Sequence, residues 1–188
     1  KDLHQAFLDS QVKAILACIG GFNSNQLLEY IDYSIIKRHP KILCGFSDIT
    51  ALLHAVYTKT GLVTYYGPNL CSFGHTVESN YTAGYFGKCL CGRSAYNLSP
   101  STRAKNYYTV QPGQCEGKII GGNLCTLNLL QGTQFMPDLN GAVLFLEDDN
   151  IMGEYFPFEF ERNLQSLLQQ KGAENLKGIV FGRFEPGC

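Results

Sequence analysis

The sequence lacks runs of like charge and long apolar stretches. Its 188 residues carry 15 Lys and Arg against 16 Asp and Glu, and neither sign gathers into a run that would favour a polyanion or a membrane surface as partner. No apolar stretch reaches the roughly 18 residues of a membrane span, and the N-terminus lacks the basic and apolar regions of a signal peptide. We therefore expect a globular, cytoplasmic protein that binds neither nucleic acid nor membranes.

The sequence also lacks the cysteine spacings of a metal site. It contains eight cysteines but no C-x-x-C pair, and Cys89-x-Cys91 has the wrong spacing for the usual zinc clusters. Several cysteines lie within apolar runs such as residues 14–19, which is typical of buried reduced thiols. We expect neither disulfides, nor a structural metal, nor a cofactor.

The first seventy residues alternate helical and extended patterns, as in a parallel sheet whose strands are connected by helices. A short helix is predicted over 2–9, and a longer helix follows Asn23 and continues past Ile35. The predicted strands cover residues 12–19, 41–45 and 62–66. The first of these is a nearly continuous apolar run, which favours a strand covered on both faces.

The pattern weakens over 71–114, where only residues 78–90 favour a helix, and becomes regular again afterwards. Strands are predicted over 118–122, 142–146 and 176–184, and a short helix over 123–131. We therefore expect an α/β protein with a parallel, doubly wound domain over 1–70, a connecting region over 71–114, and a smaller mixed α/β domain over 115–188.

Ser47 lies where a predicted strand turns directly into a predicted helix, in Gly45-Phe46-Ser47-Asp48. A sharp corner of this kind exposes a hydroxyl, and the helix N-terminus supplies partial positive charge for an oxyanion. The motif is not G-x-S-x-G, because Ile49 occupies the position of the second glycine. An ordinary helix N-cap is the alternative interpretation of Ser47.

A series of short blocks, in order along the chain, resembles the LD-carboxypeptidase family of serine peptidases, and especially its microcin-immunity branch. The blocks are Gly20 to Asn25, Ile31-Asp32-Tyr33, Pro40-Lys41, Gly45 to Leu52, Lys59 to Leu62, Tyr66-Gly67-Pro68, Gly121 to Leu124, Gly132-Thr133 and Phe145 to Asp148. They cover most of the chain outside 71–114, and so many blocks in one order are more specific than any single motif.

This resemblance implies a Ser-His-Glu triad in which Ser47 is the nucleophile and Glu147 orients the histidine. It implies an oxyanion hole formed by the backbone N–H groups of Gly21 and Asp48. The implied reaction is cofactor-free hydrolysis through an acyl-enzyme. The implied substrate is either the L,D-peptide bond of a murein peptide, as in peptidoglycan recycling, or an aminoacyl nucleotide of the microcin type. The expected candidate for the oligomeric state of this protein is a homodimer.

Two other functions remain open at this stage. A metal-dependent hydrolase could use the acidic cluster of Glu147, Asp148, Asp149 and Glu154, because hard cations favour clustered carboxylates. A ligand-binding or immunity-like domain could keep the fold without the triad. Glu147 could also be a solvated residue at the end of a strand.

The resemblance places the catalytic histidine in a block beyond Glu147, further along than these 188 residues run. No residue after Glu147 is a histidine, and the four histidines are His4, His39, His54 and His75. His75 lies in a Phe-Gly-His-Thr string similar to that around the family's catalytic histidine, but it precedes Glu147. We therefore expect a chain that lacks both ends of the family's fold, including the histidine segment.

Overall fold

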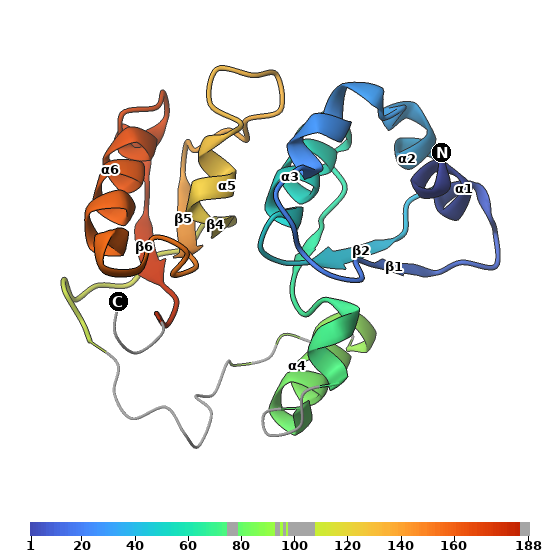
Figure 1. Cartoon of the computed structure of the whole chain (residues 1–188), viewed down its shortest axis with the longest axis horizontal. Helices are drawn as coiled ribbons and strands as arrows, with labels where there is room; N and C mark the ends of the chain where they lie inside the picture. The colour runs from blue at the N-terminus through green and yellow to red at the C-terminus, as the bar shows by residue number, and fades with distance from the viewer. Residues whose placement is uncertain (75–78, 93–94, 96, 98–107, 185–188) are drawn as a thin grey trace.

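The computed structural model describes residues 1–74, 79–92, 95, 97 and 108–184, which form two parallel three-stranded sheets with helices packed on them (Figure 1). The first sheet contains, in spatial order, β1 (Ala14–Leu16), β2 (Ile42–Gly45) and β3 (Tyr65–Tyr66). The second contains β4 (Lys118–Asn123), β5 (Ala142–Glu147) and β6 (Gly178–Phe181). The predicted α/β class with parallel strands is confirmed.

The helices alternate with the strands in both parts of the chain. Those of the first part are α1 (Asp2–Leu8), η1 (Ser24–Tyr30), α2 (Tyr33–Arg38) and α3 (Ile49–Thr60), followed by η2 (Leu70–Gly74) and α4 (Ser79–Cys91). Those of the second part are α5 (Leu124–Asn128), η3 (Gly153–Tyr155), α6 (Phe156–Leu168) and η4 (Ala173–Asn175). Helix α4 confirms the helix predicted near 78–90. In the described part of the chain, no helix combines the length and apolar character needed to cross a bilayer.

The prediction of one long helix after Asn23 is wrong. The segment contains a 3-10 helix, η1, and a separate helix, α2, because Ile31 between them is extended with φ −89° and ψ 125°. Asp32 then begins α2 by accepting a hydrogen bond from the Ser34 N–H at 2.9 Å, so a side chain that caps a new helix takes the place of continued helix. The apolar spacing continues across this break and could not reveal it.

Helix α3, which follows Ser47, lies between two hydrophobic cores. Leu53 and Val56 pack into the core of the first sheet, together with Phe7, Ile36 and Leu43. Ala51 and Ala55 belong to a larger core that includes β4, β5, α5 and α6. Their small side chains let the second half of the chain approach α3 closely. The helix behind Ser47 is therefore held by both halves of the molecule.

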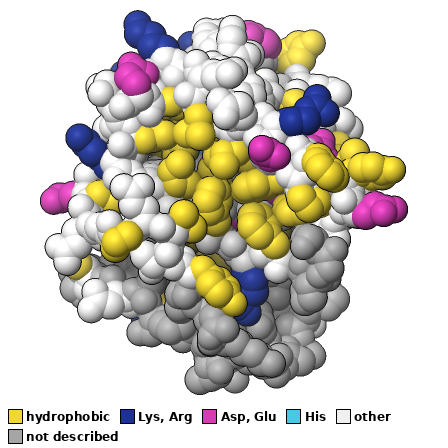
Figure 2. All heavy atoms as spheres, turned by 90° about the vertical axis from the view of Figure 1, so that its left-hand side faces the viewer, with side chains coloured by type: hydrophobic (Ala, Val, Ile, Leu, Met, Phe, Trp, Pro, Cys, Tyr) yellow, Lys and Arg dark blue, Asp and Glu magenta, His cyan; other side chains and the backbone are white. Residues whose placement is uncertain are grey.

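The strands are less covered than their apolar sequences predict. β1 has three residues, lies at the edge of its sheet, and contains no fully buried side chain, so the prediction of a strand covered on both faces is wrong there. In the second sheet, Ile120, Leu144 and Leu146 are buried, whereas the opposite face exposes apolar side chains: Ile119 by 71%, Phe145 by 39% and Val180 by 43%. Apolar side chains also gather on the side of the molecule where α6 and β6 lie (Figure 2).

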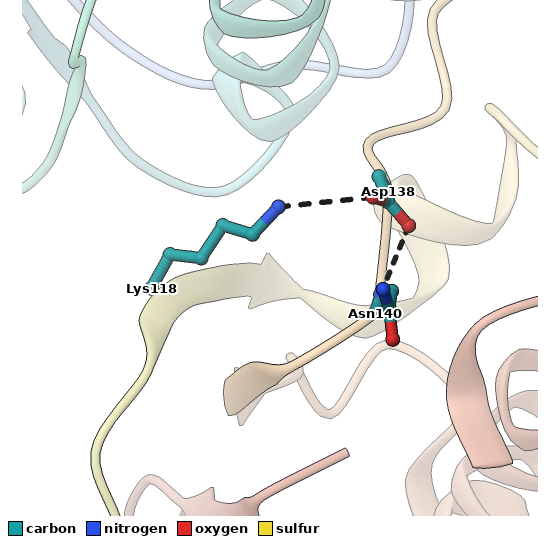
Figure 3. A network of polar contacts seen from close by, with 3 residues as sticks. All are labelled: Lys118, Asp138 and Asn140. Carbon is teal, nitrogen blue, oxygen red and sulfur yellow. Dashed lines mark hydrogen bonds and ion pairs between the residues drawn. The ribbon is translucent and has the colours of Figure 1, made fainter. Parts of the chain in front are cut away.

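A polar contact joins the start of β4 to the loop before β5. Lys118 Nζ lies 3.9 Å from Asp138 Oδ2, and Asp138 Oδ1 accepts a hydrogen bond of 3.0 Å from the backbone N–H of Asn140 (Figure 3). Both charged side chains are well exposed, so their ion pair contributes little to stability. The turn itself is fixed by the Asp138 side chain binding the backbone two residues on.

Candidate active site

Ser47 sits on a strained corner between β2 and α3. Its φ is 61°, and among the described residues it is the one non-glycine residue with a positive φ. A side chain in this left-handed region costs of order 1–3 kcal/mol and persists only where surrounding contacts impose it. The corner thus has the strained strand-to-helix geometry that projects a nucleophile from an α/β sheet.

The preceding residues show how the corner is built. A Cβ on Gly45 would lie 2.8 Å from Ile49 Cγ2 and 3.0 Å from Ala17 Cβ, so only glycine fits at the end of β2. The backbone N–H of Phe46 donates to the Asn69 side-chain oxygen at 3.2 Å. Gly45, which the sequence offered only as part of a corner motif, is required by the packing around it.

Two glycines of the loop after β1 lie beside the corner, Gly20 against Ser47 and Gly21 against the Asp48 carboxylate. A Cβ on Gly20 would lie 3.1 Å from Ser47 Cβ and 3.2 Å from its Oγ, so any larger residue there would crowd the hydroxyl. The next residue, Gly21, has φ 157°. Within the described residues, the N–H groups of Gly21 and Asp48 have no hydrogen-bond acceptor, as donors for an oxyanion would require.

The Asp48 side chain fastens this glycine loop to the corner. Asp48 Oδ2 accepts hydrogen bonds from the N–H groups of Asn23 at 3.1 Å and Ser24 at 3.0 Å, and the Ser24 hydroxyl donates to the Asp48 carbonyl. Asp48 is buried. Its carboxylate therefore acts on the structure of the loop, while its backbone N–H remains available to a ligand.

Glu147 ends β5 and reaches the corner through Tyr66. The Tyr66 hydroxyl donates a hydrogen bond to Glu147 Oε1 and accepts one from the Ser47 N–H at 3.0 Å. The described structure contains no direct hydrogen bond between Ser47 and Glu147. Burial raises the pKa of the Glu147 carboxyl, with a further rise from nearby Asp149, while the hydrogen bonds from Tyr66 and Asn123 lower it.

Asp148, the next residue, is occupied by hydrogen bonds. Its two oxygens accept from Asn123 Nδ2 at 2.9 Å and from the Cys125 N–H at 3.1 Å. Burial raises the pKa of Asp148 to about 6 in spite of these bonds. Among the described residues, no group of three or more His, Cys, Asp or Glu side chains is placed to hold a metal ion. The acidic cluster considered for a metal-dependent hydrolase therefore does not form a metal site there.

A groove with a volume of about 180 Å³ opens beside Ser47. Its lining combines polar, acidic and apolar side chains. The polar ones are Ser47, Asn123 and Thr126, and the acidic ones are Asp48, Asp148, Asp149 and Glu159. The remaining lining residues are Gly21, Phe22, Cys125, Leu129, Ile151, Met152, Phe156 and Phe160. Glu147 does not line this groove and approaches Ser47 from the side of Tyr66.

The described histidines serve other purposes. His54 Nε2 bonds the Gly121 carbonyl at 2.5 Å, linking α3 to β4, and His4 Nε2 accepts from the Asp32 N–H at 2.9 Å. His39 ends α2. His75 lies outside the described residues. None of the three described histidines hydrogen-bonds Ser47 or Glu147.

We expect His54 to make the fold sensitive to acid. Burial lowers the pKa of His54 below its ordinary 6.5, so its contribution to the free energy of unfolding is complete above that pH and is lost as the pH falls through the lowered pKa. His54→Gln keeps an N–H donor for Gly121 but cannot titrate. Urea denaturation at pH 7 and pH 5 should therefore show a larger acid-induced loss for the wild type than for the variant. Equal losses would show that His54 is not the group responsible.

Three site residues have no signal of their own in the sequence: Thr50, Tyr66 and Asn123. All three lie within the blocks that resemble the family, but nothing in those blocks assigns them a contact. Thr50 Oγ1 donates to the Ser47 carbonyl at 2.6 Å and accepts from the Asn123 N–H at 3.1 Å. The first contact is local to the start of α3, whereas the second joins residues 73 apart and arises only from the way the two sheets meet.

Comparison with known families matches both parts of the chain. Residues 1–67 match the model of the LD-carboxypeptidase N-terminal domain, and residues 116–187 match that of the LD-carboxypeptidase C-terminal domain. A Bacillus subtilis protein named as a carboxypeptidase, YocD, is 46% identical over 98% of this chain and 61% of its own length. A second Bacillus subtilis protein, named "probable murein peptide carboxypeptidase", is 39% identical over 97% of this chain and 56% of its own. The chain therefore spans less than two thirds of these relatives.

Solved structures give the same result. A MccF-like protein from Bacillus anthracis superposes with a TM-score of 0.90 at 44% identity, covering 99% of this chain and 62% of its own. The microcin C7 self-immunity protein MccF, in complex with aspartyl sulfamoyl adenosine, superposes with a TM-score of 0.78 at 31% identity, covering 98% and 61%. One further MccF structure is an active-site mutant with alanine in place of a serine, an asparagine and a lysine.

Proposed function

This chain belongs to the LD-carboxypeptidase family, and we propose on that basis that it carries the nucleophile and the orienting carboxylate of a serine peptidase. One observation carries the proposal: Ser47 stands on a strained corner, against Gly20 and beside a groove, and the Tyr66 hydroxyl links its backbone N–H to Glu147. A serine that only capped a helix would not need that strain. The proposal also includes the division of the chain into a domain over 1–70, a connecting region over 71–114 and a second domain over 115–188.

In the proposed mechanism, Ser47 Oγ attacks the carbonyl carbon of the scissile amide, and a histidine takes its proton. The N–H groups of Gly21 and Asp48 donate to the oxyanion. As the C–N bond breaks, the histidine gives its proton to the leaving amine and the acyl-enzyme forms. Water, deprotonated by the same histidine, then hydrolyses the ester, and the proton returns to Ser47. Glu147 holds the tautomer of the histidine and stabilises its protonated form. The described residues do not supply this histidine, so we assign it to sequence outside them.

The groove supports a substrate that is partly apolar and not strongly anionic. Among the described residues, its lining includes Asp148, Asp149 and Glu159 but no Lys or Arg. Ser47 and Asn123 line it, matching in type two of the three residues replaced in the MccF mutant. The names of the relatives support two substrate classes, a murein peptide and an aminoacyl sulfamoyl nucleoside.

A hydrolysis assay of the complete protein tests this function. We expect hydrolysis of at least one of two substrates, with release of the terminal D-amino acid from a murein tetrapeptide or of aspartate from aspartyl sulfamoyl adenosine, and the relative rates decide between the two substrate classes. Residues 1–188 alone should be a poor hydrolase, with at most the ~10³ to 10⁴ acceleration that an oxyanion hole and binding can give without a base. No turnover by the complete protein on either substrate would favour a ligand-binding domain. Full activity of residues 1–188 would indicate His75 as the base.

A further inference from the structure

The Ser47 backbone is held on both sides by side chains. Its N–H donates to the Tyr66 hydroxyl at 3.0 Å, and its carbonyl accepts from Thr50 Oγ1 at 2.6 Å. The Thr50 N–H also donates to that carbonyl at 2.9 Å, which is an ordinary turn contact. A residue with φ 61° needs external contacts to keep this conformation. Tyr66 and Thr50 provide them.

Both side chains are themselves held by the second sheet. The Tyr66 hydroxyl donates to Glu147, and Thr50 Oγ1 accepts from the Asn123 N–H. Asn123 and Glu147 are register partners at the ends of β4 and β5, so the two anchors lie side by side at the carboxyl edge of that sheet. The contacts on Ser47 therefore run from one sheet to the other.

Gly122 shows how closely the sheets approach at this point. A Cβ on Gly122 would lie 2.8 Å from Tyr66 Cε2 and 2.9 Å from Thr50 Oγ1. The glycine has φ 119°, so a side chain would also strain the backbone. Both positioning side chains thus pack directly on the β4 backbone, and neither can relax away from Ser47 independently of it.

We propose that Tyr66 and Thr50 are positioning residues that couple the conformation of Ser47 to docking of the second sheet, so that the nucleophile is aligned only when Glu147 and Asn123 are in place. The inference rests on the proposed hydrolase function. Tyr66 has one proton to donate, and it goes to Glu147, which leaves the phenol oxygen free to accept the Ser47 N–H. Burial and the charge of Glu147 raise the pKa of Tyr66, so it remains a donor.

The test compares Tyr66→Phe with Tyr65→Phe in the complete protein. Tyr65 is the neighbouring residue in β3, and its hydroxyl makes no hydrogen bond with the described residues. We expect Tyr66→Phe to lower kcat, and the rate of labelling by a fluorophosphonate, by roughly 10²-fold with KM within about twofold of wild type, because a misplaced nucleophile lowers the rate of reaction more than it weakens binding. Tyr65→Phe should react like the wild type.

Variants of Thr50 provide an independent test, with a conservative substitution as its control. Thr50→Val keeps the shape but loses the hydroxyl, and we expect it to lower kcat by roughly 10-fold, whereas Thr50→Ser should recover most of the rate. A purely structural role would lower the melting temperature without this split between kcat and KM. Wild-type kcat and labelling in both Tyr66→Phe and Thr50→Val would overturn the proposal.

Amide exchange separates failure of this inference from failure of the proposed function. In Tyr66→Phe the Ser47 N–H loses its acceptor, so its hydrogen exchange measured by NMR should accelerate at least 10-fold relative to wild type and Tyr65→Phe. This readout needs no activity. If the wild type neither labels nor hydrolyses but the exchange changes as expected, the hydrolase function fails and the coupling stands. Unchanged exchange contradicts the coupling.

Discussion

Ser47→Ala in the complete protein should lower kcat by roughly 10⁶-fold, with KM almost unchanged. The hydroxyl is the proposed nucleophile, and no other described group at the corner can replace it. The fold should be unaffected, because Ser47 Oγ makes no hydrogen bond with the described residues and alanine bears the same cost of a positive φ as serine. Steady-state kinetics and fluorophosphonate labelling measure the loss, and thermal denaturation measures the stability.

Two further variants sharpen this result. Ser10→Ala removes an exposed hydroxyl from a residue that does not line the groove and should react like the wild type. Ser47→Gly should be inactive yet more stable than Ser47→Ala, by about 0.5 to 1 kcal/mol, because glycine adopts φ 61° without strain. If Ser47→Ala kept more than a tenth of the wild-type kcat, Ser47 would not be the nucleophile; capping is no alternative, because the N-cap residue of α3 is Asp48 and Ser47 Oγ makes no hydrogen bond with the described residues.

Glu147→Gln should lower kcat by about 10⁴-fold. The amide has the same shape and can still accept the Tyr66 hydroxyl through its oxygen, so the fold and the corner should persist. What it loses is the negative charge that stabilises a protonated histidine and the acceptor that fixes the tautomer of its ring. The drop should appear in kcat at saturating substrate, while labelling of Ser47 slows in parallel.

Glu161→Gln provides the matched control, since Glu161 is an exposed carboxylate on α6 that is not part of the groove lining. It should change kcat by less than twofold. Activity of Glu147→Gln within tenfold of wild type would remove Glu147 from the triad and leave it only as the acceptor of the Tyr66 hydroxyl.

The sequence predicted the elements that depend on local chemistry. Strands β2, β4 and β5 lie almost where their apolar runs predicted, and α4 lies where a weak pattern favoured a helix. The break at Ile31 was missed, because the apolar spacing continues through it and a capping side chain, Asp32, decides the outcome. The exposed face of the second sheet was also missed, since a continuous apolar run does not reveal which face is covered.

The sequence by itself determined the corner at Ser47, since Gly45 and the helix that follows it restrict the backbone over a few residues. Only the tertiary structure decided what surrounds that corner. Tyr66 binds partners that lie 19 and 81 residues away, and Thr50 binds Asn123, 73 residues away, so no periodicity or local motif records these contacts. They exist because α3 packs into both cores and brings the carboxyl edge of the second sheet against the end of the first.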